Sequence, residues 1–241
     1  MGVSHDKNKR AFAPELVDGL MNAERFVAGK APKEIFITID PNGGGDSDFA
    51  LVSAYFDRGT MIIAGFESIN SKGPNDHNPI IVQHVLRLQV RWPHTTYVFI
   101  LENNLGFEAK HIHSYLQPKL KGKIVYMAEK EHVGFHTDHK LKELMFERFR
   151  EWLTRDAIRF DSQVMAMNPN KTTKKVLDEL TEQLHTYSII TVMPKTPFAK
   201  PKTTYSGKVT TGAKDDVLIT IQLTLVWFDR FYKDSKYAPF R

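Results

Sequence analysis

The sequence predicts an α/β domain with a mixed central sheet, in which three antiparallel strands are followed by parallel strands and helices flank the sheet. Three short apolar segments rich in β-branched and aromatic residues follow one another across short turns, which is typical of an antiparallel meander. Helical and strand patterns then alternate along the chain, which favours parallel strands. Hydrophobic residues make up 41% of the 241 residues, enough for the core of one large domain.

The strands are predicted from apolar runs bounded by turn-forming residues. The first run, EIFITID at residues 34–40, precedes a glycine-rich turn at 41–47. The run TTYVFIL at 95–101 is almost wholly apolar, which indicates a strand buried on both faces. The predicted strands are residues 34–40, 49–56, 61–66, 95–101 and 123–127, with a turn at 57–59 between the second and third.

Helices are predicted where the apolar spacing changes to about 3.6 residues. Pro93 marks the end of the second of them. The predicted helices are residues 14–27, 78–92, 106–120, 138–153, 172–187 and 214–232. Residues 131–137 and 193–205 are predicted to be loops, the latter because it combines three prolines with lysines and threonines.

The domain organisation follows from where the first strong strand begins. Residues 1–33 are polar and mixed, so we predict a lead-in or linker there. Residues 34–241 should form one domain, since neither a second boundary nor an internal repeat is apparent in them.

Composition excludes several classes of protein. The formal net charge of +5 suits a polyanionic partner but does not require one. The chain has no cysteine, which excludes disulfides, thiolate metal sites and cysteine catalysis. No apolar run approaches the roughly 20 residues of a membrane helix, and the first residues lack the apolar core of a signal peptide. We therefore expect a soluble protein that acts inside a cell, without a membrane partner.

Acidic residues stand at the ends of three predicted elements and form the candidate site. Asp40 ends the first strand, Glu102 follows the strand at 95–101, and Asp215 with Asp216 opens the last helix. Carboxylates at strand ends emerge at the rim of a sheet, where open sheets tend to place ligands. If the two strands are neighbours, they lie about 5 Å apart, and Asp40 and Glu102 can share one cation.

A carboxylate set of this kind predicts a divalent metal site. Without a cation, closely spaced carboxylates repel one another. Hard oxygen ligands with no histidine or cysteine suit Mg²⁺ or Mn²⁺, and the sequence leaves the choice between the two open. Two such ions about 4 Å apart can hydrolyse a phosphodiester.

Each acidic position also has a structural interpretation. Asp40 before Pro41 could form a turn, the residues after Glu102 could form another, and Asp215 could cap its helix. The three placements in one consistent topology favour the metal site.

The acidic motifs resemble those of the nuclease domain of large terminase subunits. ITIDPNGGGDSDFALVSAYF at 37–56 is similar to the first motif, FILENN at 99–104 to the second, and SGKVTTGAKDDVLITIQL at 206–223 to the third. GFHTDHKLK at 134–142 resembles a segment that these nucleases carry between the second and third acids. The ending FDRFYKDSKYAPF at 228–240 is similar to herpesvirus-type terminases. The resemblance covers about residues 34–240.

The resemblance implies a ribonuclease H-like fold and two-metal cleavage of double-stranded DNA, coupled to packaging into a capsid. It implies that Asp40, Glu102 and Asp215 bind the two Mg²⁺ or Mn²⁺ ions, with Asp216 as a fourth ligand. Family members also carry an ATPase motor. This sequence shows no Gly-Lys-Ser/Thr phosphate loop, so we expect the motor outside this chain.

The expected function is therefore an endonuclease that cuts concatemeric viral DNA with low sequence specificity. The implied partners are DNA, the terminase ATPase domain and other terminase subunits, and the capsid portal. The implied location is the host nucleus for a herpesvirus-type protein, and otherwise the host cytoplasm.

Other polar residues of the motifs could assist the acids. Lys140 could hold the scissile phosphate or orient the water, with His136 close by, or both could belong to a solvated loop and helix start. Asp138 could be a helix N-cap. The basic stretch at 195–208 could contact DNA backbone or be a plain solvated loop.

Other functions stay open on the sequence alone. Histidine pairs such as His132 and His136 raise a weaker zinc hypothesis. A Holliday-junction resolvase or strand-transfer enzyme would use the same fold and acids. A non-catalytic module that docks DNA or a protein would carry degenerate acids.

Overall fold

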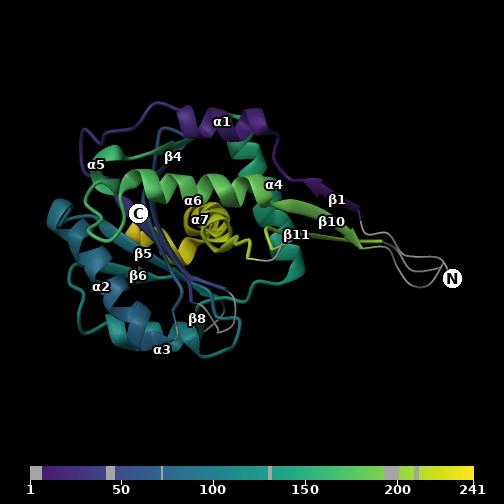
Figure 1. Ribbon diagram of the computed structural model, residues 1–241. Helices are drawn as coiled ribbons and strands as arrows, with labels where there is room; N and C mark the ends of the chain where they lie inside the picture. Colours follow the sequence, from purple (N-terminus) through teal and green to yellow (C-terminus); the bar gives the residue numbers. More distant parts are fainter. Residues whose placement is uncertain (1–6, 42–46, 72, 130–131, 193–200, 209–211) are drawn as a thin grey trace.

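The computed structural model describes residues 7–41, 47–71, 73–129, 132–192, 201–208 and 212–241. Its centre is a six-stranded sheet in the order β6-β5-β2-β3-β4-β9 (Figure 1). Strands β2 (Glu34–Asp40), β3 (Phe49–Asp57) and β4 (Thr60–Ile69) form an antiparallel meander. Strands β5 (Thr96–Leu101) and β6 (Lys123–Tyr126) continue the sheet in parallel beside β2. The predicted mixed sheet is confirmed.

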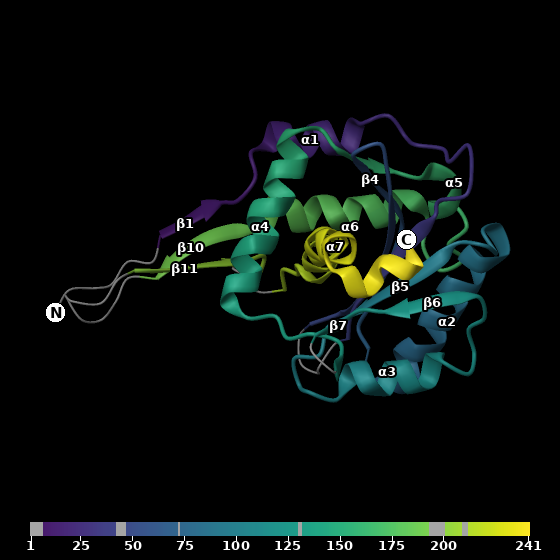
Figure 2. The same cartoon turned by 180° about the vertical axis from the view of Figure 1, so that it is seen from behind.

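Helices cover both faces of this sheet (Figures 1 and 2). Helix α7 (Asp216–Lys233) runs along one face against β2 and β3, and α4 (His139–Thr154) and α6 (Thr173–Thr186) pack beside it. Helices α2 (Pro74–Arg91) and α3 (Glu108–Leu116) lie against each other and bury their apolar residues with those of the opposite face. The architecture is therefore helix, sheet, helix in three layers.

This layering explains why β2 is apolar almost throughout. Side chains alternate between the faces of a strand. Ile35, Ile37 and Ile39 pack with residues of α2 and α3, whereas Phe36 packs with residues of α7. The exception is Thr38, which hydrogen-bonds to a residue of the covering helix α7.

A buried hydrogen bond places α7 along β2. The hydroxyl groups of Thr38 and Thr224 lie 2.7 Å apart, and both residues are fully buried. A buried hydroxyl without a partner costs about 1–3 kcal/mol, so sliding α7 along the strand is disfavoured. The first residues of α7 thereby lie near the tip of β2.

Two short elements at one edge of the sheet escape sequence analysis. Strand β9 (Ile158–Phe160) pairs in parallel with β4, and α5 (Ser162–Met165) follows it. Asp161 caps this helix, accepting from the backbone N–H of Gln163 and of Val164, both at 3.0 Å. Elements of three or four residues are too short to show a period.

A second sheet projects from the body as an arm (Figures 1 and 2). It pairs β1 (Lys7–Arg10), β10 (Ser188–Val192) and β11 (Lys202–Ser206) in antiparallel fashion, with β10 in the middle. The loop predicted at 193–205 is therefore wrong for residues 202–205, and residues 193–200 lie outside the described part of the chain. Pairing with β10 makes β11 a strand despite its polar composition.

The segment before β2 packs on the same core as the rest. Helix α1 (Pro14–Asn22) buries Val17 and Leu20 among residues of α4 and α6, such as Phe149 and Leu180. The helix predicted at 14–27 ends five residues early. The backbone of Ala23 leaves the helical conformation there, with ψ of 147°.

Two other helix boundaries differ from prediction. Helix α2 begins at Pro74, four residues before the predicted start, and contains Pro79. Pro74 takes the first position of the helix, where the N–H needs no intrahelical partner, whereas Pro79 lies inside the helix and removes one intrahelical hydrogen bond. Helix α3 spans only Glu108–Leu116 of the predicted 106–120.

One glycine allows the chain to cross closely beside the end of β5. After β7 (Ala128–Glu129) and β8 (His132–Val133), Gly134 adopts φ of +89°. A Cβ atom there would lie 2.4 Å from the Cβ of Ala109 and 3.0 Å from the carbonyl oxygen of Leu101. The close approach is what allows the next residue to pair with β5.

This pairing supports the residue that follows β5. The backbone N–H of Phe135 donates to the carbonyl of Leu101 at 3.1 Å, and Asn103 donates to Phe135 at 2.8 Å. Glu102 thereby forms a bridge with Phe135, one residue beyond the strand.

None of the helices in the described residues is long and apolar enough to cross a membrane.

We expect Gly134→Ala to destabilise the fold by roughly 3 kcal/mol, because it adds both a left-handed backbone penalty and a steric clash. Gly59→Ala is the matched control: Gly59 also has positive φ, at +80°, but nothing lies within 4 Å of its added Cβ. It should cost roughly 1 kcal/mol. Urea unfolding of both variants measures the difference, and equal losses would contradict the proposed crossing.

Candidate metal centre

Asp40 and Glu102 lie together at the carboxyl ends of two neighbouring strands. Strands β2 and β5 pair in parallel up to Ile39 and Leu101. The backbone N–H of Glu102 then donates to the carbonyl of Ile39 at 3.0 Å. The side chains of Asp40 and Glu102 are hydrogen-bonded to each other, and this contact raises the pKa of Asp40. The predicted adjacency of the two strands is confirmed.

The acids that open α7 do not cap that helix with their side chains. The backbone N–H of Leu218, in the first turn, donates instead to the side-chain oxygen of Gln183 in α6, at 2.9 Å. Asp215 stands at the N-cap position without a side-chain cap bond. Its carboxylate accepts from the backbone N–H of Gly207 at 2.7 Å. The helix-cap interpretation of Asp215 therefore fails, and both acids point away from the helix N–H groups.

The four acids line one cavity of about 370 Å³. The cavity lies where the tips of β2 and β5 meet the end of β11 and the start of α7. The structure thus brings together all four predicted metal ligands, Asp40, Glu102, Asp215 and Asp216. Among the other residues that line it are Ser47, Asn104, Glu108, Lys142 and Lys208.

Crowding of the carboxylates changes their protonation. Burial raises the pKa of Asp40 well above its ordinary value, and the charge of Glu102 and the hydrogen bond with it raise the pKa further. Burial also raises the pKa of Asp216, although hydrogen bonds from the backbone of Asp48 and from Lys208 oppose it. The cavity therefore retains protons that isolated aspartates would lose.

Lys208 supplies a positive charge inside this acidic group. Its ammonium lies 3.0 Å from Oδ1 of Asp216 and 3.6 Å from Oδ1 of Asp215, and it donates to the hydroxyl of Ser47 at 2.6 Å. Burial disfavours the charged form, but the hydrogen bond to Asp216 and the nearby carboxylates outweigh it, so the pKa of Lys208 is raised. In the sequence Lys208 lies within the third acidic motif and the basic stretch at 195–208, and neither pattern predicts this contact with the acids.

Asp48 is a second residue that the sequence analysis left without a role. Its backbone N–H donates to Oδ2 of Asp216 at 3.1 Å. Its buried carboxylate accepts from Lys214, from Ser68 at 3.3 Å and from Asn70 at 3.4 Å. Asp48 thus ties the start of β3 to the end of β4 and to the residue before Asp215. In the sequence Asp48 is an acid directly before a predicted strand, and that position alone does not distinguish it from an ordinary turn residue.

The donor set fits a divalent cation. In the described residues no three acidic or histidine side chains yet form a coordinating group. Instead a hydrogen bond joins the side chains of Asp40 and Glu102, and the ammonium of Lys208 lies 3.6 Å from Asp215 and 3.0 Å from Asp216. Carboxylate oxygens are the ligands that Mg²⁺ and Mn²⁺ prefer. Asp40, Glu102 and one or both of the α7 acids are the residues that would hold such ions.

Lys140 lies apart from these acids. It is exposed in the first turn of α4 and is not among the residues that line the cavity, whereas Lys142 in the same turn is. His136 is also exposed. Asp138 is the N-cap of α4, accepting from the N–H of Leu141 at 2.7 Å, as its structural interpretation predicted.

His132 and His136 are both exposed, and the zinc hypothesis stays a prediction from the sequence. His139 instead pairs its ring Nε2 with the carbonyl of Thr203 at 2.6 Å, which links α4 to the arm.

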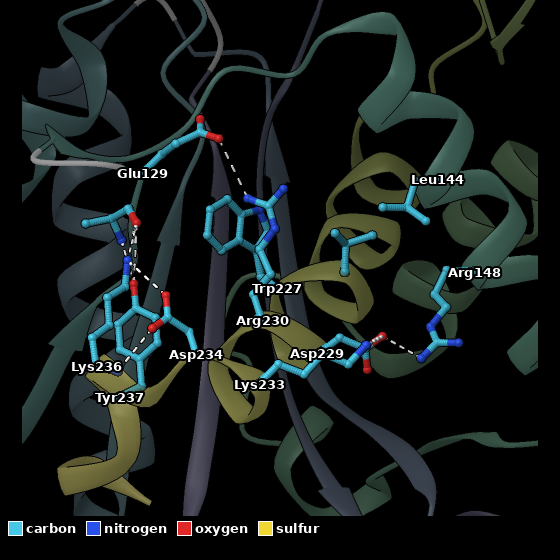
Figure 3. A pocket seen from close by; sticks show the side chains of 12 residues that line it. Glu129, Leu144, Arg148, Trp227, Asp229, Arg230, Lys233, Asp234, Lys236 and Tyr237 are labelled. Atoms are coloured by element: carbon cyan, nitrogen blue, oxygen red, sulfur yellow. Dashed lines mark hydrogen bonds and ion pairs between the residues drawn. The ribbon is translucent and has the colours of Figure 1, made fainter.

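A larger cavity of about 530 Å³ lies elsewhere, along the C-terminal half of α7 (Figure 3). Its charged side chains pair with one another, as Arg148 does with Asp229 and Arg230 with Glu129. None of the predicted site residues lines it. The candidate centre is therefore the smaller, acidic cavity.

Solved structures of terminase nuclease domains share this fold. The human cytomegalovirus terminase nuclease domain, soaked with Mn and bound to an inhibitor, matches with a TM-score of 0.65 and 13% identity over 95% of this chain and 97% of that one. The nuclease domain of the large terminase subunit gp2 of bacterial virus Sf6 matches at 0.54 and 12%, over 90% and 98%. The large terminase of the thermophilic bacteriophage D6E, in complex with ATP-gamma-S, matches at 0.50 and 9%, over 87% and 44%.

The ribonuclease H-like fold is therefore confirmed. No family model matches the sequence, and no curated protein does so either. At identities of 9–13% the likeness establishes the fold alone, and the side chains of the acidic cavity are the evidence for its chemistry.

We expect Asp40→Asn to stabilise the metal-free protein at neutral pH by roughly 0.5–2 kcal/mol, because asparagine keeps a hydrogen bond to Glu102 without a buried charge. A raised pKa means that the folded protein holds the proton more tightly than the unfolded chain. Stability from Asp40 is therefore present at low pH and lost as pH rises through the folded pKa, and the variant should lack this loss.

Unfolding in the presence of a chelator, at several pH values, measures this effect. The same change at the exposed Asp178 of α6 is the control. If Asp40→Asn is less stable than the wild type, burial and the charge of Glu102 do not destabilise the folded protein through the Asp40 carboxylate.

Proposed function

We propose that this chain is a metal-dependent endonuclease that hydrolyses double-stranded DNA. The observation that carries the proposal is the convergence of Asp40, Glu102, Asp215 and Asp216 on one cavity. The names of the structural neighbours support it, since they are terminase nuclease domains and one was soaked with Mn.

The four acids would supply the metal ligands, and backbone N–H groups around them fix their orientation. Asp40 and Glu102 present oxygens from adjacent strand tips, and Asp215 and Asp216 present them from the start of α7. The backbone N–H groups of Gly207 and Asp48 orient the two α7 acids. Two divalent ions, when bound, would activate a water and stabilise the leaving oxygen of the phosphodiester.

Cationic side chains around the cavity suit the DNA backbone. Lys142 and Lys208 line the cavity itself. The adjoining arm exposes Lys9, Arg10 and Lys202, and β11 of that arm leads directly into the site. Contacts from lysine and arginine to phosphates carry no base information, so we propose low sequence specificity.

Genome packaging is the proposed setting. The substrate would be concatemeric viral DNA, cut as a capsid is filled, and the partners would be a terminase ATPase domain, other terminase subunits and the portal. The bacteriophage D6E large terminase supports this setting, since it is a longer protein of which the matched region is 44%. The corresponding location is the host nucleus for a herpesvirus-type protein, and otherwise the host cytoplasm.

Plasmid cleavage with Mn²⁺ tests the proposed activity. Supercoiled DNA should be nicked and linearised by the wild type. Asp40→Ala, Glu102→Ala and Asp215→Ala should each lower the rate by about 100-fold or more, because each removes a ligand that stabilises charge in the transition state. Asp178→Ala, an acid on the exposed face of α6, should cleave as the wild type does.

The outcomes separate the alternative functions. Activity that survives all three ligand substitutions would remove the assigned mechanism. Cleavage confined to four-way junctions, with linear duplex left intact, would favour a resolvase. A protein that binds DNA but neither binds Mn²⁺ nor cuts would be a docking module.

A further inference from the structure

The ammonium of Lys208 occupies the acidic cavity in place of an external cation. It donates to Ser47 at 2.6 Å and to Asp216 at 3.0 Å, and it lies 3.6 Å from Asp215. The neighbouring lysine of the same segment, Lys214, is instead bound to Asp48. Lys208 is thus the cation that compensates the α7 acids here.

The backbone at Lys208 is held independently of its side chain. Its N–H donates to the hydroxyl of Ser206 at 3.0 Å, and the N–H of Gly207 donates to Asp215 at 2.7 Å. A Cβ atom on Gly207 would lie 2.8 Å from the Cβ of Asp215, so the segment lies directly against the start of α7. The lysine side chain is 36% exposed. Its four-carbon stem can therefore move the ammonium out of the cavity without moving the backbone.

A divalent ion and the ammonium compete for the same oxygens. A carboxylate oxygen of Asp216 that binds Mg²⁺ or Mn²⁺ does so at about 2.1 Å. The Nζ of Lys208 now lies 3.0 Å from such an oxygen, and two cations held there would repel each other strongly. Binding of the ion therefore requires that the ammonium withdraw.

We propose that Lys208 is a displaceable internal counter-ion that couples metal binding to DNA binding, an inference that rests on the proposed function. In the metal-free protein it stabilises the acidic cavity. Once displaced, its three N–H donors lie at the rim and bind a phosphate of the DNA. Because DNA removes the competitor, DNA tightens metal binding, and metal tightens DNA binding by the same factor.

Manganese titration of the full chain tests this coupling. In the absence of DNA, Lys208→Met should bind Mn²⁺ on the order of tenfold more tightly than the wild type, since the competitor is gone. Its metal-free form should melt at a lower temperature. Lys208→Arg keeps the charge and should resemble the wild type. Lys174→Met makes the same charge change on the exposed face of α6 and should have no effect.

The same titration with a short phosphorothioate duplex completes the test. Added duplex should tighten Mn²⁺ binding to the wild type severalfold more than to Lys208→Met. Lys208→Gln should behave as Lys208→Met does, so a folding defect in one variant does not remove the test.

The outcomes separate the two claims. If the wild type binds Mn²⁺ but Lys208→Met binds it equally or more weakly, the counter-ion role is overturned and the proposed nuclease stands. If neither protein binds Mn²⁺, the metal centre is overturned and the counter-ion role with it.

Discussion

The central constraint on this structure is the mutual repulsion of four carboxyl groups that line a single cavity. Asp40, Glu102, Asp215 and Asp216 come from two strands and a helix that are far apart in sequence but converge in space. Like charges so close cannot all stay ionised without compensation. The raised pKa of Asp40 and the ammonium of Lys208 provide this compensation. A divalent cation bound among the four acids, as we propose, would remove this repulsion.

Contacts elsewhere in the fold hold the four acids together despite this repulsion. The buried pair Thr38–Thr224 places α7 along β2, and Gln183 caps α7 so that Asp215 is free for the cavity. Gly134 lets the chain support Glu102 from the far side of β5. These residues lie outside the acidic motifs, yet they decide where the carboxylates point. The proposed metal centre therefore depends on the packing of the whole domain, with apolar layers on both faces of β2.

The sequence predicts the mixed sheet and the four acids because both leave local signals. Apolar strands buried on both faces read as continuous runs, and Asp40 and Glu102 stand directly at their ends. The sequence does not single out Lys208, because one lysine in a basic stretch resembles any solvated lysine. Its role follows only from the tertiary contacts that bring its side chain to Asp215 and Asp216. Asp48 and Gln183 likewise act through long-range contacts that carry no period. Strand β11 was missed because its pairing with β10, not its composition, makes it a strand. The sequence points to Lys140, whereas Lys142 is the lysine of α4 that lines the cavity, because the rotation of the helix decides which side chain faces the site.

The central claim is that this cavity holds divalent cations between the two strand tips and the start of α7. Crystals soaked with Mn²⁺ and measured at the manganese absorption edge test it directly. The account predicts anomalous density among the oxygens of Asp40, Glu102 and the α7 acids, with the ammonium of Lys208 moved out of contact with Asp216. Manganese bound only elsewhere, with the Asp40–Glu102 contact and the Lys208–Asp216 pair intact, would contradict it.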